Sequence, residues 1–309
     1  IFIKAASAAN GNLTLNNNQI DWYQTDNYKV RETPLADTIT VDNLTITNYS
    51  EVYYSGTTTV VNSYLLDQYS YYILSGTLNT NSLSVLNTSQ FNLQNTADVT
   101  YSSLNWTSGI LIDNGGTFAL LSGGGDLTIP ATSTLFSNVP RSYTNVTVSG
   151  TLSHSSNGTT ETYKLNYTVS GNMTINSGAS VNVGGRGYSA SNGPGAGADG
   201  NEGAGGAAYA GLGGNGNARA GSNIFYGNYL LPDNLGSGGG QPNAGGAGAG
   251  GGQRSPCRRR ARAARAGDRL VGLQGRAHPP DPAAHHERPA VCANRLGAAR
   301  GGGQAFAAA

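Results

Sequence analysis

The chain has 309 residues and a net charge of +1, and only 11% of its residues are charged. Asn, Thr, Ser and Gly fill the polar positions, which excludes a helical protein held together by rows of charged pairs. Helix formers are scarce before residue 254, so the composition favours an all-β fold. No stretch reaches the roughly 18 consecutive apolar residues that a membrane-spanning helix needs, and no span is expected in these residues.

The charges divide into two regions of opposite sign. Residues 1–253 carry seven Lys and Arg against 14 Asp and Glu, whereas residues 254–309 carry 11 Arg against three acids. Both cysteines, Cys257 and Cys292, lie in the second region. A cysteine-free, Thr- and Asn-rich β chain suits export and exposure, so we expect an extracellular or cell-surface location.

The first 35 residues are expected to contribute short strands, one at Ile1–Ile3 and one around Leu13 and Leu15. The sequence begins at Ile1 without an initiator Met or a signal-like leader. We therefore interpret it as a fragment or a processed piece, and residues 1–35 as strands that continue from a preceding module.

From residue 36 to residue 183, short runs alternate between apolar and polar residues. Ile39 and Val41, and later Ile110 and Ile112, are examples of apolar residues at every second position. Ser-Gly, Asn-Thr and Asn-Gly dipeptides separate the runs. Alternation with a period of two predicts strands with one buried face, and the dipeptides predict the turns between them.

One sequence repeat is clearer than the others. Val148–Ser153 returns as Val169–Thr174, and the distance between the two copies fits one coil of a solenoid. We therefore predict a right-handed parallel β-helix over residues 36–183, in which neighbouring coils stack to bury a continuous core. The Ser-Gly dipeptides recur at irregular intervals, so an antiparallel β-sandwich is the structural alternative.

Residues 184–253 hold 26 glycines separated by small residues and a few aromatic ones. Glycine loses the most conformational entropy on ordering, so this segment is expected to be flexible unless its backbones pack closely. We predict a glycine-rich module appended to the solenoid, and the Tyr-rich, apolar island Ile224–Leu231 indicates that part of this module docks on the solenoid end.

The composition changes again at Arg254. Ala and Arg together make up almost half of residues 254–309. Glycine codons of the form GGC encode Ala or Arg when they are read one frame over. We interpret this Arg/Ala-rich tail as a disordered, frameshifted continuation of the glycine-rich segment. The alternative is a genuine basic tail, whose Arg258–Arg260 would bind nucleic acid phosphates; otherwise no nucleic acid is expected.

The block Met173–Tyr188, followed by glycine-rich sequence, resembles large bacterial secreted or surface β-helix proteins of the adhesin type. The resemblance covers residues 1–253 and implies that strand-turn-strand coils lead into a glycine-rich insertion. Ile1–Ala5 looks like the strand that resumes after such an insertion. The motifs imply location and architecture and contain no catalytic signature.

Seven tyrosines crowd into the stretch from Tyr49 to Tyr72. Tyrosine gives a large contact area with a polar tip, so a row of tyrosines can stack on sugar rings or contact a protein. The alternative is that alternate members fill the core, because Tyr is a favoured strand residue. The predicted ligand-binding residues are Tyr53, Tyr54, Tyr64, Tyr69, Tyr71, Tyr72 and Trp106.

Parallel β-helices also include polysaccharide lyases and glycosidases. A glycosidase needs two carboxylates about 5 to 9.5 Å apart, and equivalent positions of adjacent coils are about 4.8 Å apart. Acids one coil apart would qualify, but Asp98, Asp113 and Asp126 are closer in sequence than a coil. We therefore favour a non-enzymatic surface or secreted adhesive solenoid that displays its loops and its Tyr-rich face to a glycan or protein. A polysaccharide-degrading enzyme is the alternative, and no cofactor or metal is expected.

Overall fold

The computed structural model describes residues 2–3, 9–17, 33–35, 37–200, 203–216, 220–228, 230 and 233–241. These residues form strands and turns without a helix, so the all-β prediction is confirmed. The described part accordingly contains no helix with the length and hydrophobicity of a membrane span. The Arg/Ala-rich tail, including the predicted phosphate-binding arginines and both cysteines, lies outside the described residues.

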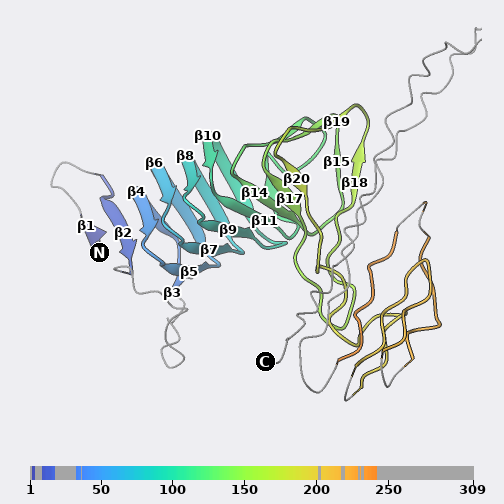
Figure 1. Cartoon of the computed structure of the whole chain (residues 1–309). Helices are drawn as coiled ribbons and strands as arrows, with labels where there is room; N and C mark the ends of the chain where they lie inside the picture. Colours follow the sequence, from blue (N-terminus) through green and yellow to red (C-terminus); the bar gives the residue numbers. More distant parts are fainter. Residues whose placement is uncertain are drawn as a thin grey trace, which may run out of the picture. The chain divides into compact units, whose positions relative to one another are not determined.

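Two long sheets run along the solenoid (Figure 1). Sheet A consists of β1 (Phe2–Ile3), β2 (Asn12–Asn16), β4 (Ile39–Thr47), β6 (Thr57–Leu66), β8 (Thr77–Leu86), β10 (Asp98–Thr107) and β12 (Thr117–Phe118). Sheet B consists of β3 (Thr33–Leu35), β5 (Glu51–Tyr54), β7 (Tyr71–Leu74), β9 (Gln90–Leu93), β11 (Ile110–Asp113), β14 (Thr134–Ser137), β17 (Thr151–Ser153) and β20 (Ser180–Val181).

Two smaller sheets follow near the end of the solenoid. One contains β13 (Leu127–Ile129), β16 (Val146–Val148) and β19 (Met173–Ile175), and the other contains β15 (Arg141–Tyr143) and β18 (Tyr167–Val169). Apart from the antiparallel pair of β1 and β2, every pair of these strands is parallel. The sheets stack as a parallel β-solenoid of about six turns, which confirms the predicted solenoid and excludes the antiparallel sandwich.

The parallel register shows how the chain repeats from coil to coil. Thr57 pairs with Thr77 and Thr77 with Asp98, so these coils are almost equal in length. Later coils are less regular, because β17 pairs with β20 and Thr151 lies opposite Ser180. The repeat seen in the sequence is not a coil, since β16 pairs with β19 and not with β18. The loop after β17 lengthens this part of the chain and shifts the register away from the repeat.

Coils also extend before residue 36. β2 pairs in parallel with β4, and β3 pairs in parallel with β5. Both sheets therefore begin within the segment that the sequence assigned to separate N-terminal strands.

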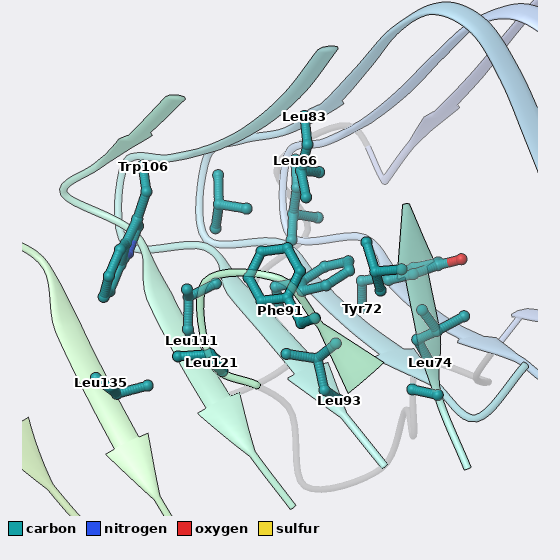
Figure 2. Packing of buried hydrophobic residues seen from close by; sticks show 14 of the residues in the cluster. Leu66, Tyr72, Leu74, Leu83, Phe91, Leu93, Trp106, Leu111, Leu121 and Leu135 are labelled. Carbon is teal, nitrogen blue, oxygen red and sulfur yellow. The ribbon is translucent and has the colours of Figure 1, made fainter. Parts of the chain in front are cut away.

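The core fills the interior of the coils (Figure 2). In β8, Leu78 and Thr80 are buried and then Leu83 and Val85, so the buried position shifts by one residue along the strand. This shift marks a corner, because consecutive side chains of a straight strand alternate between faces. In the coils of β4, β6 and β8, sheet A therefore covers two sides and sheet B covers the third.

The alternation at Ile110 and Ile112 predicted the wrong buried face for this strand. Ile110 and Ile112 of β11 are half-buried on the outer face, whereas Leu111 and Asp113 are buried inside. The run contains three consecutive apolar residues, so alternation alone did not define its inner face. Asp113 is accepted inside because Arg141 neutralises it with two hydrogen bonds, at 2.8 and 2.6 Å.

The described glycine-rich residues hold together through their backbones. Gly206 N donates to Gly214 O at 2.8 Å, and Gly213 N donates to Ser222 O at 2.9 Å. A Cβ atom at Gly213 would lie 2.1 Å from Gly206 O, so these segments approach more closely than any side chain allows. The apolar island does not bury its first residues: Ile224 and Phe225 are 60% and 63% exposed. These two side chains are therefore not docked, and the docking of another part of this segment stays a prediction.

Candidate functional site

The predicted Tyr-rich face divides between the core and the surface. Tyr54, Tyr64 and Tyr72 are buried, because each occupies an inward position of its strand. Trp106 is only 5% exposed, and its indole Nε1 donates to Gly109 O at 2.9 Å. Figure 2 shows Tyr72 and Trp106 among the core residues. These four residues pack the solenoid and do not form a ligand-binding face, contrary to the prediction.

The most exposed of the predicted tyrosines lies at a corner between sheets A and B. Tyr69 is 55% exposed and stacks on Tyr49, with ring centroids 5.2 Å apart and planes 9° apart. Both residues have a positive φ, and they occupy equivalent corners of adjacent coils. Because one face of Tyr69 is covered by Tyr49, this pair offers little ring face to a ligand.

Tyr53 and Tyr71 lie half-buried on the outer face of sheet B. The register places Tyr53, Ile73, Asn92 and Ile112 in one row across this face. Such a row combines aromatic, aliphatic and amide side chains, whereas most outward rows of sheet A contain Thr, Ser and Asn. Sheet B therefore carries the candidate surface.

An open pocket of about 470 Å³ lies over this face. Its volume falls in the range of small-molecule sites, about 300 to 1,000 Å³. Of the predicted residues, only Tyr71 lines it. The lining residues are Tyr71, Asn92, Gln94, Asn95, Ile112, Asn114, Ser155 and Tyr163. The pocket thus joins aromatic rings to amide and hydroxyl groups, with Ile112 as its aliphatic member.

A ladder of amides forms the floor of the pocket. Asn92 Nδ2 donates to the Tyr71 hydroxyl at 2.7 Å, and Asn114 Nδ2 donates to Asn92 Oδ1 at 2.8 Å. Asn138 Nδ2 donates to Asn114 Oδ1 at 2.7 Å and to Ser155 Oγ at 2.9 Å. Each residue follows or lies within a successive strand of sheet B, so the ladder crosses five strands from β7 to β17. These bonds fix the side chains before any ligand arrives.

The loop that carries Tyr163 is held by a second buried amide. Asn157 Oδ1 accepts hydrogen bonds from the backbone N–H groups of Thr162 and Tyr163, at 2.7 and 2.8 Å. Its Nδ2 donates to the Tyr163 carbonyl at 2.8 Å. Because Asn157 is buried, these bonds are shielded from competing water and keep the backbone of Tyr163 in place.

The pocket lining contains no carboxylate, ammonium or guanidinium group. Lys164, next to Tyr163, is paired with Glu161 at 2.7 Å. Arg186 lies over the Phe136 ring, 5.0 Å from its centroid, and donates to Ser156 Oγ at 2.9 Å. The charged groups of this region are therefore engaged elsewhere, and the pocket is polar but uncharged.

A glycosidase of this fold would need two acidic residues one coil apart. The paired positions of the described strands contain no such pair. Asp98 lies opposite Thr77 and Thr117, and Asp113 lies opposite Leu93 and Ser137. The described residues also contain no group of three or more His, Cys, Asp and Glu side chains that could hold a metal ion.

One buried histidine contacts the end of the ladder. His154 Nδ1 lies 2.8 Å from Ser155 O, while its buried Nε2 has no hydrogen-bond partner among the described residues. Burial lowers the pKa of His154 below its usual value, and the positive charge of Arg186 lowers it further. The ring is therefore held in its neutral form next to a residue that lines the pocket.

The sequence interpretation did not identify the amides of this site. Asn92, Asn114 and Asn138 follow one another at separations of 22 and 24, and each comes at or just after the end of a sheet B strand. Asn114 and Asn138 follow paired residues of adjacent coils, and this recurrence was the available signal, but the abundance of Asn concealed it. Asn92 pairs with Ile112, so it does not occupy the equivalent position of its coil. Comparison with known proteins adds no further guide, because no family model, no curated protein and no solved structure matches this chain.

Proposed function

We propose that this protein is a non-enzymatic, secreted or cell-surface adhesive β-solenoid that binds glycans in the pocket between Tyr71 and Tyr163. The observation that carries the proposal is the composition of the pocket lining, in which two phenol rings accompany four amides without any carboxylate. Sugars present hydroxyl groups to amides and C–H faces to aromatic rings, and Tyr serves both kinds of contact. A glycosidase ordinarily needs a pair of carboxylates at such a place, and the lining supplies none.

The preorganised amides also support a binding role. Asn92 is buried and takes part in three hydrogen bonds, to Tyr71, Gln94 and Asn114. A ligand that meets fixed groups loses less affinity to the ordering of side chains. The uncharged lining favours a neutral partner, and an extracellular location would give this pocket access to cell-surface or matrix polysaccharides.

The proposal is tested by incubating the full chain with an array of immobilised glycans. We expect the chain to bind a subset of neutral glycans, and Tyr163→Ala to weaken this binding about tenfold or more, because a stacking face and a hydrogen-bonding hydroxyl are removed. Tyr69→Ala is the matched control, since it deletes an exposed tyrosine outside the pocket. Absence of binding to any glycan, or equal losses in the two variants, would refute the proposal.

A further inference from the structure

The hydrogen bonds within the amide ladder decide which groups remain for a ligand. Asn92 Oδ1 accepts from Gln94 Nε2 at 3.0 Å and from Asn114 Nδ2 at 2.8 Å, so both of its lone pairs are used. Asn138 Nδ2 spends its two hydrogens on Asn114 and Ser155. Asn92 and Asn138 are buried members of the ladder whose role is to orient their neighbours.

Gln94 and Asn114 keep unused capacity. Each spends one amide hydrogen on a different lone pair of the same atom, Asn92 Oδ1, so their two amide groups flank this oxygen. Asn114 retains one N–H donor, and Gln94 Oε1 has no hydrogen-bond partner among the described residues. The pocket therefore offers a donor and an acceptor on the two sides of Asn92 Oδ1, both held in place by Asn92.

An aliphatic wall adjoins this pair. Ile112 lies directly opposite Asn92 in the sheet register and faces outward into the pocket. The carbonyl and the N–H of a secondary amide point in opposite directions, so such a group uses all three features when it lies between the two side chains. Its carbonyl then meets the Asn114 N–H, its N–H meets Gln94 Oε1 and its methyl group packs on Ile112. We propose that the ligand is a neutral saccharide containing N-acetylhexosamine, whose acetamido group occupies the space between Gln94, Asn114 and Ile112.

This inference rests on the proposed glycan binding and adds the class of sugar. Simple hexoses offer hydroxyl groups to the two amides but leave Ile112 without an apolar partner. Acidic sugars would bring a carboxylate to a lining without a cation, because Lys164 is paired with Glu161. Leaving a charge without a partner in a partly desolvated pocket is costly. The acetamido group satisfies the polar and the apolar features together without adding charge.

The decisive measurement compares two trisaccharides with the same linkage, one of N-acetylglucosamine and one of glucose, by isothermal titration calorimetry on the full chain. We expect the N-acetylated ligand to bind about tenfold more tightly or better, as one or two additional hydrogen bonds and a buried methyl group imply. In Gln94→Met the preference should shrink to about twofold or less, because the acceptor for the acetamido N–H is lost.

Gln90→Met is the matched control. Gln90 is the first residue of β9, lies on the same outer face as the pocket and does not line it. It should keep the full preference. Circular dichroism confirms that both variants keep their strands. Equal affinity for the two trisaccharides, or an unchanged preference in Gln94→Met, would overturn the acetamido inference while leaving glycan binding intact. If neither trisaccharide binds and the glycan array is also negative, the proposed function itself fails; if only other glycans on the array bind, the inference alone fails.

Discussion

The solenoid and the glycine-rich segment satisfy their backbones in two different ways. In the solenoid, parallel strands pair at the usual sheet spacing and side chains such as Leu83 and Phe91 fill the interior. In the glycine-rich segment, backbones hydrogen-bond outside the four sheets, and Gly213 approaches Gly206 too closely for a Cβ atom. The first region depends on the side chains that are present, and the second depends on side chains that are absent.

The comparison also explains why the two regions accept different residues. The φ angles of Gly205, Gly213 and Gly240 lie outside the left-handed region, so other residues could adopt their backbone conformation. These positions need glycine because neighbouring backbone oxygens occupy the space of a methyl group. In the solenoid, turn glycines such as Gly76 and Gly150 meet the same limit, with backbone oxygens 2.0 and 2.2 Å from the position of a Cβ atom. Elsewhere in the solenoid, a change is harmful where a side chain is shortened or loses its partner.

The largest effect is expected for Arg141→Ala in the solenoid. Asp113 is only 1% exposed, and the substitution leaves its carboxylate without the guanidinium that accounts for two of its hydrogen bonds. Loss of one partner of a buried pair costs about 3 to 5 kcal/mol, measured as the free energy of unfolding in urea. Lys164→Ala is the control, because its exposed pair with Glu161 should contribute less than about 1 kcal/mol. Similar losses in the two variants would contradict the assignment.

The next effect concerns the glycine-rich segment. Gly213→Ala places a Cβ atom about 2.1 Å from Gly206 O, and relieving such an overlap costs about 1 to 3 kcal/mol. We expect faster amide hydrogen exchange in peptides covering residues 203–228, with unchanged exchange in the solenoid. Gly214→Ala should leave the exchange unchanged, because no heavy atom lies within 4 Å of the position that its Cβ atom would occupy and its φ is not in the left-handed region. Equal exchange in both variants would show that close approach is not what maintains this segment.

A smaller effect separates two buried tyrosines of the solenoid. The Tyr64 hydroxyl is buried without a hydrogen-bond partner among the described residues, whereas the Tyr54 hydroxyl donates to the Asp37 carbonyl. Tyr64→Phe should therefore raise the free energy of unfolding by up to about 1 kcal/mol, and Tyr54→Phe should lower it by about 1 kcal/mol. Thermal and urea unfolding measure both. A loss of stability in Tyr64→Phe would mean that its hydroxyl has a partner in solution.

The smallest effect is a dependence on pH that comes from His154. Burial lowers the pKa of His154 in the folded chain, so below about pH 6.5 the unfolded chain binds a proton more readily than the folded chain. The stability that His154 contributes is complete above this pH and is lost progressively as the pH falls toward the lowered pKa. We expect His154→Asn to reduce the difference in unfolding free energy between pH 7.5 and pH 5.5. If the unfolding free energy changes equally between the two pH values in the parent chain and in the variant, His154 is not the source of the pH dependence.

The sequence predicted the strands better than it predicted their faces. Alternation identified β4, because apolar residues such as Ile39 and Val41 are separated there by polar ones. It did not assign the members of Tyr53-Tyr54 and Tyr71-Tyr72, since adjacent tyrosines give no difference in polarity. The face of each ring is decided by the strand register, which places Tyr54 and Tyr72 inside and Tyr53 and Tyr71 outside.

The pocket was harder to predict because its residues are far apart in sequence. Tyr71 and Tyr163 meet only because several coils of unequal length bring sheet B and the loop after β17 together. The insertion that lengthens this loop also supplies Ser155 and Tyr163. The same insertion therefore hides the coil repeat in the sequence and contributes two residues to the pocket. Local patterns do not contain this register, which is set by the packing of the core.

The amide ladder has a mechanical consequence. Each coil of a solenoid contacts mainly its two neighbours, so tension on a single coil can peel it away from the stack. The bonds from Tyr71 through Asn114 to Ser155 link five consecutive strands of sheet B. A pull applied to one of these side chains is therefore shared among the five strands, and we expect several coils to yield together under force.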